Sequence, residues 1–222
     1  MSMLKADAGL SFSADEFFAR AKARLTFDVP PGLTDAALIP FSGDHGNDRM
    51  LRIVASEQPI RPAAVLIAIV DHPVPTVLLT QRAAHLNDHA GQISFPGGKI
   101  DPGDRSPLDA ALREAEEEVG LPRDFVEPIG YLDLYATGFG FRILPTVARV
   151  KPGFTLAINE NEVEEAFEVP LAFLMDPANH QLHSKEFRGV ERSYYAMPFG
   201  ERYIWGATAG MLRVLYERIG QS

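Results

Sequence analysis

The stretch that most constrains the fold of this chain covers residues 97–121, GGKIDPGDRSPLDAALREAEEEVGL. A glycine pair and an acidic loop lead into a segment with helical periodicity. Ser106 can cap this helix, Pro107 suits its first position because a missing N–H costs nothing there, and Gly120 follows its last periodic residue. Apolar residues recur along one stripe of the helix: Leu108, Ala111, Leu112, Ala115 and Val119. We therefore expect a helix that is buried along this stripe and directly preceded by a glycine-rich turn.

Three glutamates share the helix face beside the apolar stripe. At about 100° per residue, Glu114, Glu117 and Glu118 fall within an arc of about 100°. Like charges at these offsets repel, and Arg113, four residues before Glu117, offsets part of the cost. Carboxylate oxygens are the ligands that Mg²⁺ and Mn²⁺ prefer, and these ions keep bound water that can act as a nucleophile. The spacing indicates a divalent-metal site, while a solvated acidic helix face stays open as the alternative.

Two adjoining motifs resemble those of a known family. Residues 113–121, REAEEEVGL, match the core REUXEEXGU of the Nudix box GX5EX7REUXEEXGU, in which U is a bulky aliphatic residue. The chain departs from the full box because Asp104 stands in place of the first glutamate and one extra residue precedes Arg113. Residues 78–98, LLTQRAAHLNDHAGQISFPGG, resemble the signature LLTxR[SA]xxxRxxxGxxxFPGG of the coenzyme A pyrophosphatase branch, whose box is longer. Asn87 replaces the second arginine of that signature.

The resemblance to Nudix hydrolases implies an architecture. The Nudix fold belongs to the α/β (α+β) class, with a mixed β-sheet sandwiched between α-helices. We expect this domain to occupy residues 59–222, and residues 1–58 to form an N-terminal arm, a helix and the lead-in to the domain. Within the domain, apolar patterning predicts strands and a hairpin followed by a closing helix, at residues 63–70, 76–82, 127–135, 141–150, 192–206 and 207–220.

The same resemblance implies a reaction, which is the metal-dependent cleavage of coenzyme A or its derivatives to 3′,5′-ADP and 4′-phosphopantetheine. The cofactor is then Mg²⁺ or Mn²⁺, held by one backbone carbonyl and three carboxylates: Gly98, Glu114, Glu117 and Glu118. Arg113 orients Glu117. Glu160 or Glu162 supplies a further ligand or a base, and a plain charged turn stays open as the alternative for these two residues. Two alternatives stay open: another nucleoside diphosphate derivative such as ADP-ribose or a dinucleotide, and a non-catalytic nucleotide-binding module. The intact glutamates argue against the second.

Several residues near this stretch can contact a nucleotide. Arg82 is the candidate for a phosphate or ribose contact because a guanidinium binds bidentately, and a structural ion pair is its alternative. Lys99 can meet phosphate or merely solvent. Phe139 and Phe141 can stack on an adenine and Arg142 can hold the nucleotide, although aromatic loop residues often only pack.

Composition limits the partners that we expect. A net charge of −9 opposes attraction to nucleic acid or to an anionic membrane, so the expected partner is a small nucleotide. The absence of cysteine excludes disulfides and thiol catalysis and fits a cytoplasmic protein, while a homodimer stays open. Ser13 and Glu16 form the pattern of a helix capping box, and this first helix should pack on the domain or on a second subunit. His45 is expected to be solvated.

Overall fold

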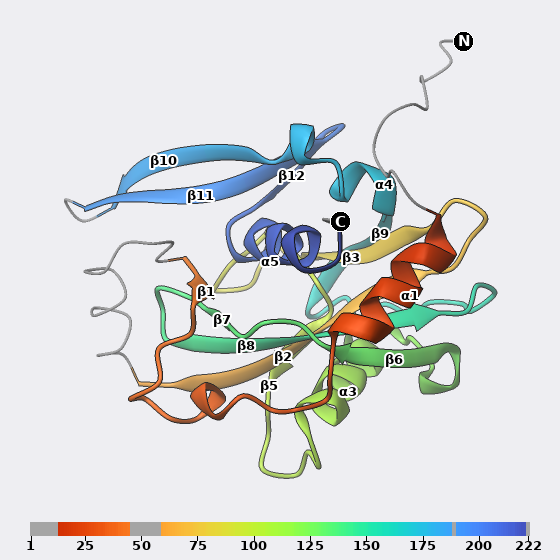
Figure 1. The fold of residues 1–222 in the computed structure, drawn as a ribbon, viewed down its shortest axis with the longest axis horizontal. Coiled ribbons are helices and arrows are strands. Elements are labelled where there is room, and N and C mark those ends of the chain that lie inside the picture. Colours follow the sequence, from red (N-terminus) through yellow and green to blue (C-terminus); the bar gives the residue numbers. More distant parts are fainter. Residues whose placement is uncertain (1–12, 45–58, 188–189, 221–222) are drawn as a thin grey trace.

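The structure is a computed structural model of the chain in which residues 13–44, 59–187 and 190–220 are described (Figure 1). His45 and residues 1–12 and 45–58 of the expected N-terminal segment lie outside the described residues, and the boundary at residue 58 stays a prediction. Within the described parts, the main sheet has nine strands: β1 (Ser42–Gly43), β2 (Arg61–Val70), β3 (Thr76–Arg82), β4 (Ile93–Ser94), β5 (Gly97–Lys99), β6 (Val126–Tyr131), β7 (Tyr135–Ala136), β8 (Phe141–Val150) and β9 (Val163–Pro170).

The main sheet is mixed, as predicted. β2 and β8 pair in parallel over ten residues, from Arg61 opposite Phe141 to Val70 opposite Val150. β1 and β7 are also parallel, whereas the other pairs are antiparallel. On its other side, β2 pairs with β5 at its beginning and with β3 at its end. The short strand β5 therefore lies where β2 and β3 have separated.

Helices cover both faces of this sheet (Figure 1). They are α1 (Ala14–Arg24), α3 (Pro107–Val119), α4 (Leu171–Leu174) and α5 (Ala207–Leu215), with a π-helical turn at Tyr216–Gly220 and 3₁₀ turns at Pro31–Leu33, Arg123–Phe125 and Pro177–Asn179. Alternate residues of β2 belong to two cores: Leu66 packs with α3, whereas Ile67 packs with α1 and α5. This explains why β2 is apolar without interruption, since both of its faces are buried.

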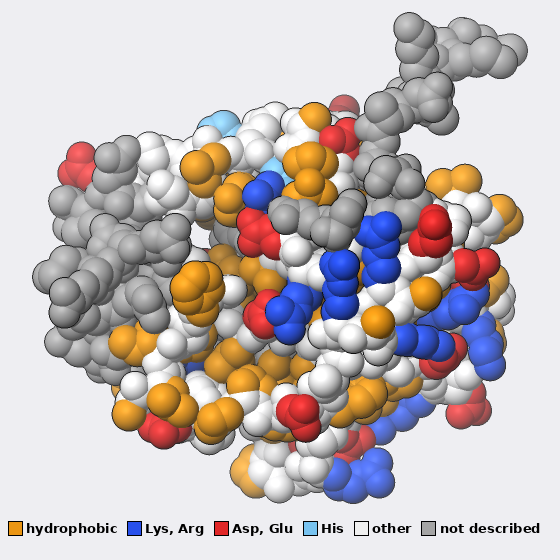
Figure 2. Space-filling model, in the orientation of Figure 1, with side chains coloured by type: hydrophobic (Ala, Val, Ile, Leu, Met, Phe, Trp, Pro, Cys, Tyr) orange, Lys and Arg blue, Asp and Glu red, His pale blue; other side chains and the backbone are white. Residues whose placement is uncertain are grey.

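The first helix packs against the domain itself. Its capping box is confirmed, because the Ser13 N–H donates to Glu16 Oε2 at 2.6 Å and the Glu16 N–H donates to Ser13 Oγ at 3.3 Å. Phe17 and Phe18 are buried in the core shared with α5. On the α1 and α5 side, a cavity of about 580 Å³ opens between residues 30–42 and the end of α5, and Figure 2 shows hydrophobic side chains gathered near the centre of this view.

A second, antiparallel sheet contains β10 (Gln181–Phe187), β11 (Val190–Phe199) and β12 (Arg202–Trp205). The predicted hairpin is confirmed as β11 and β12, whereas β10 was not predicted. The strand expected at 127–135 is confirmed up to Tyr131 as β6, but its continuation is wrong: residues 132–134 form no strand, and Tyr135 begins the separate strand β7. Within the described parts of the chain, no helix combines the length and apolar character that crossing a membrane requires.

Candidate functional site

Helix α3 is positioned by the local signals that predicted it. Ser106 Oγ accepts the Asp109 N–H at 3.1 Å, Pro107 is the first helical residue, and Gly120 ends the helix in the left-handed conformation with φ of 67°. The predicted stripe is buried at its three small or branched positions, Ala111, Ala115 and Val119, while its two leucines are half-buried. Glu118 lies next to this stripe on the helix and is also buried.

The glycine pair in β5 brings the backbone against both the sheet and the helix. Gly97 has φ of +152°, and a Cβ there would lie 2.6 Å from the Cα of Val65. A Cβ on Gly98 would lie 2.5 Å from the carboxylate of Glu114. Any larger residue at these positions would therefore push β5 from β2 or displace the Glu114 carboxylate.

Glu118 is the most strongly perturbed acid of the site. Its exposed fraction is 3%, and its Oε2 accepts the Gly97 N–H at 3.1 Å. Burial raises the pKa of Glu118 to about 7; the Gly97 hydrogen bond and the charge of Arg82 oppose this shift, and the charges of Glu114 and Glu162 add to it. Burial also raises the pKa of Glu114, against the lowering effect of Arg113. The buried surroundings of Glu114 and Glu118 thus disfavour the negatively charged form of both side chains.

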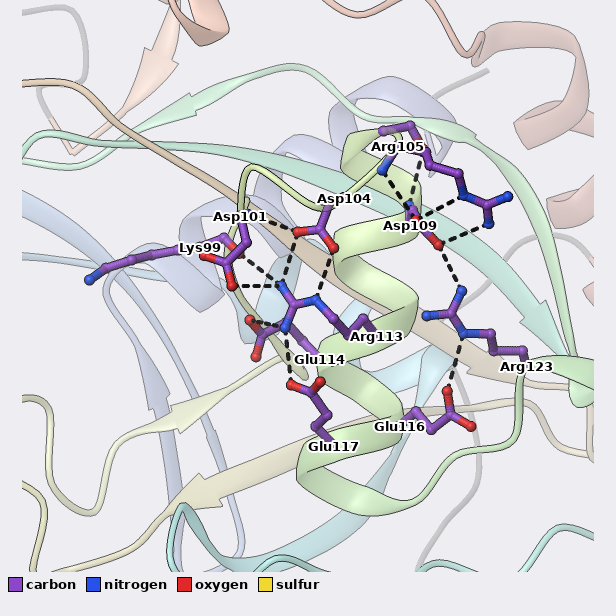
Figure 3. A network of polar contacts seen from close by, with 11 residues as sticks. Lys99, Asp101, Asp104, Arg105, Asp109, Arg113, Glu114, Glu116, Glu117 and Arg123 are labelled. Atoms are coloured by element: carbon purple, nitrogen blue, oxygen red, sulfur yellow. Dashed lines mark hydrogen bonds and ion pairs between the residues drawn. The ribbon is translucent and has the colours of Figure 1, made fainter.

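Arg113 joins the acidic loop to the helix (Figure 3). Its guanidinium donates to Asp104 through Nε to Oδ1 at 2.9 Å and through Nη2 to Oδ2 at 3.0 Å. Nη1 donates to Glu114 Oε1 and to Glu117 Oε2, each at 3.0 Å, and Nη2 donates to the Lys99 carbonyl at 3.3 Å. The expected contact between Arg113 and Glu117 is present. Asp104, the residue that departs from the Nudix box, is the buried partner that fixes Arg113, and this pair holds the pKa of Asp104 below its usual value.

Two further groups act on the carboxylates from β3 and from the start of β9. Arg82 lies at the end of β3, and among the described residues its buried Nε has no hydrogen-bond partner. Glu162 accepts a hydrogen bond from Asn159 Nδ2 at 3.1 Å, and its charge reaches both Glu114 and Glu118. Glu160 is exposed. Of the two acids expected in this loop, Glu162 is the one whose charge acts on the helix carboxylates.

The other expected nucleotide contacts are distributed around the site. The Lys99 side chain is exposed, and Asn87 is exposed on the loop after β3. Phe139 is 54% exposed, and its ring meets the ring of His89 with centroids 6.0 Å apart. Arg142, in contrast, is 2% exposed at the beginning of β8. Neither the contact between Phe139 and His89 nor the burial of Arg142 is indicated by a local sequence pattern.

The donor set suits a hard divalent cation. Carboxylate and carbonyl oxygens are the ligands such ions prefer, and the buried Glu118, with Glu114 and Glu162 acting on it, would be relieved by a positive charge. As these side chains stand, the described residues contain no group of three His, Cys, Asp or Glu that could hold a metal ion. Glu114 and Glu117 instead accept hydrogen bonds from Arg113. Each of these contacts uses one carboxylate oxygen, so the second oxygen of Glu114 and of Glu117 is not engaged by Arg113.

Comparison with known proteins identifies relatives of this chain. A family model described as the NUDIX domain matches residues 60–189. The uncharacterized Nudix hydrolase NudL of Shigella flexneri is 40% identical over 174 residues, which cover 78% of this chain and 91% of that protein. NudL of Escherichia coli (strain K12) is 42% identical over 160 residues, covering 72% and 83%. The solved Nudix hydrolase RenU from M. smegmatis aligns with a TM-score of 0.42 and 23% identity over 49% of this chain and 70% of RenU.

Proposed function

The chain belongs to the Nudix family of hydrolases, which act on pyrophosphate bonds, and from this premise we propose that its substrate is coenzyme A or a coenzyme A derivative. The products are 3′,5′-ADP and 4′-phosphopantetheine. Nudix hydrolases generally use divalent metal ions, and we propose Mg²⁺ or Mn²⁺ for this chain.

One observation carries the choice of substrate. The stretch that resembles the coenzyme A branch, residues 78–98, begins in β3 and ends at the glycine pair of β5. Its arginine, Arg82, acts electrostatically on Glu118, and its last glycines contact Glu114 and Glu118. The branch-specific residues and the helix carboxylates are therefore parts of one site, so they can act on one substrate.

The proposed roles follow from these contacts. Gly98, Glu114, Glu117 and Glu118 hold the ion, which when bound neutralises pyrophosphate oxygens and lowers the pKa of a coordinated water. Arg113 orients Glu114 and Glu117 because it contacts both, and Asp104 fixes Arg113.

Other side chains bind the nucleotide or move the proton. Arg82 binds the pyrophosphate, because its buried Nε is free to donate among the described residues. Lys99 binds an outer phosphate from its exposed position, and Phe139 stacks on the adenine beside His89. Glu162 accepts the proton of the attacking water, since within the described parts of the chain its side chain bonds to Asn159 alone and lies within electrostatic reach of the helix acids.

The test is a substrate panel with mass detection of the products. Purified protein is incubated with Mg²⁺ or Mn²⁺ and with coenzyme A, ADP-ribose, NADH or a nucleoside triphosphate. We expect selective release of 3′,5′-ADP from coenzyme A. Turnover of another compound instead would reject the proposed substrate and retain the pyrophosphate chemistry. Binding of nucleotides without any turnover, by correctly folded protein, would reject the hydrolase and favour a binding module.

A further inference from the structure

Arg142 is a buried cation whose terminal nitrogens lack a hydrogen-bond partner in the part of the chain that the structure describes. Its exposed fraction is 2%, and both Nη1 and Nη2 are shielded from solvent with no hydrogen-bond partner among the described residues. Burial lowers the pKa of its guanidinium, and no acidic group among the described residues opposes this effect. Arg149 on the same strand shows the contrast: it donates to Asp71 Oδ2 at 2.9 Å and lies over the ring of Phe18 at 4.7 Å.

An unpaired buried charge is costly, so its retention calls for a compensating anion. A guanidinium remains charged in proteins and presents its donors in a fork that matches phosphate oxygens. No carboxylate of residues 13–44, 59–187 or 190–220 supplies the counter-charge, so these parts of the chain leave the cost uncompensated. A bound phosphate would remove it.

The position of Arg142 connects it to the nucleotide end of the site. β8 begins directly after residues 137–140, the loop that carries the exposed Phe139. Asp44 fixes this loop by accepting the Gly138 N–H at 3.1 Å and the Tyr135 hydroxyl at 3.0 Å. Arg142 follows Phe139 by three positions in the sequence, so their Cα atoms are at most about 11 Å apart. An adenine stacked beside Phe139 would therefore bring the substituents of its ribose within range of Arg142.

Arg82 and Arg142 each have a buried donor without a hydrogen-bond partner among the described residues, and they differ in the charges that act on them. Arg82 is within electrostatic reach of Glu118, at the pyrophosphate end of the site. No described acidic residue acts in this way on Arg142. We propose that Arg142 is the receptor for a phosphate monoester on the substrate, namely the 3′-phosphate that distinguishes coenzyme A from other nucleoside diphosphate derivatives. This inference rests on the proposed function and assigns its specificity to one residue.

The consequence for the ligand-free protein is unusual. Because both Nη atoms are covered, the phosphate must displace the side chains that shield them, and the charge-assisted hydrogen bonds that form must outweigh this opening. Replacement of Arg142 by methionine, which has a similar length and no charge, should then stabilise the ligand-free protein while it weakens binding.

The experiment measures binding without metal, so that no turnover occurs. The affinities of 3′,5′-ADP and 5′-AMP, which differ by the 3′-phosphate, are compared by titration calorimetry. We expect the wild type to prefer 3′,5′-ADP at least tenfold, and Arg142→Met to reduce this preference to about twofold or less. Its affinity for 5′-AMP should not change, and its melting temperature without ligand should not fall.

Two further variants complete the design. Arg61→Met is the matched control, because Arg61 is exposed on the neighbouring strand over the ring of Phe141, and it should keep the full preference. Arg142→Lys keeps the charge without the fork, should reduce the preference several-fold, and decides the matter if the methionine variant does not fold. An absent preference in the wild type, or an unchanged one in both Arg142 variants, would overturn the assignment. Because no turnover is needed, this result is independent of the substrate panel.

Discussion

A Glu118→Gln substitution removes a buried charge and keeps an oxygen that can accept the Gly97 N–H. Since burial raises the pKa of Glu118 from 4.5 to about 7, the folded protein binds a proton there that the unfolded chain has lost between these pH values. The contribution of Glu118 to stability is therefore fully present below pH 4.5 and is lost as the pH rises from 4.5 to about 7. At about 1.4 kcal/mol per pKa unit, the charged side chain costs roughly 3 kcal/mol at pH 8 in metal-free protein.

The glutamine variant should recover this free energy and lose activity. At about 2–4 °C per kcal/mol for a chain of this size, its metal-free melting temperature should rise by roughly 6–12 °C at pH 8 and stay unchanged near pH 4. We expect kcat/KM to fall at least about a hundredfold, because an oxygen ligand of the metal loses its charge. Calorimetric melts at the two pH values and metal-dependent turnover measure both effects.

Glu116→Gln is the matched control for this measurement. Glu116 lies on the same helix, is exposed, and pairs with Arg123 at 3.2 Å. Its substitution should change neither the pH dependence of melting nor the turnover, since exposed ion pairs contribute little. A Glu118→Gln protein that is less stable than the wild type at pH 8, or that remains fully active, would refute the argument from burial.

Three other substitutions test the supports of the site. Gly98→Ala should leave the melting temperature within a few degrees and reduce kcat/KM at least about tenfold, because the flexible Glu114 carboxylate can yield to the new Cβ only by moving. Gly97→Ala should instead destabilise by about 2–4 kcal/mol in denaturant unfolding, because its Cβ meets backbone and its φ is unfavourable. Arg113→Met should destabilise by about 3 kcal/mol, because it leaves the buried Asp104 carboxylate unpaired, and Asp104→Asn in the same background should recover part of this loss.

Features encoded within a few residues were predictable from the sequence. Ser106 and Gly120 mark the ends of α3 because capping is decided by neighbouring backbone groups. The capping box at Ser13 is predictable for the same reason. The apolar run of β2 indicated a strand buried on both faces, since few other environments accept eight consecutive apolar residues.

Features that depend on distant contacts were not predictable. The sequence does not indicate that Glu118 is buried whereas Glu117 is exposed, because that difference depends on how β5 approaches α3. Asp104 read as a departure from a motif, and only its contact with Arg113 gives it a structural role. The burial of Arg142 follows from the strands and segments that surround β8, which no local pattern specifies. β10 was missed because its polar residues match a loop as well as an exposed strand.

The parallel pairing of β2 with β8 has a consequence for how the chain acquires its site. Paired residues such as Ile67 and Val147 are about 80 residues apart in sequence, and everything between these strands, including β5 and α3, belongs to the segment that their pairing closes. Closing this long segment costs chain entropy before the contacts that compensate for the cost have formed. Folds dominated by pairing between distant residues therefore form slowly. During synthesis, the glutamates would leave the ribosome well before the strand that completes their support. The glutamates of α3 therefore remain exposed to water until β8, which ends at Val150, has left the ribosome.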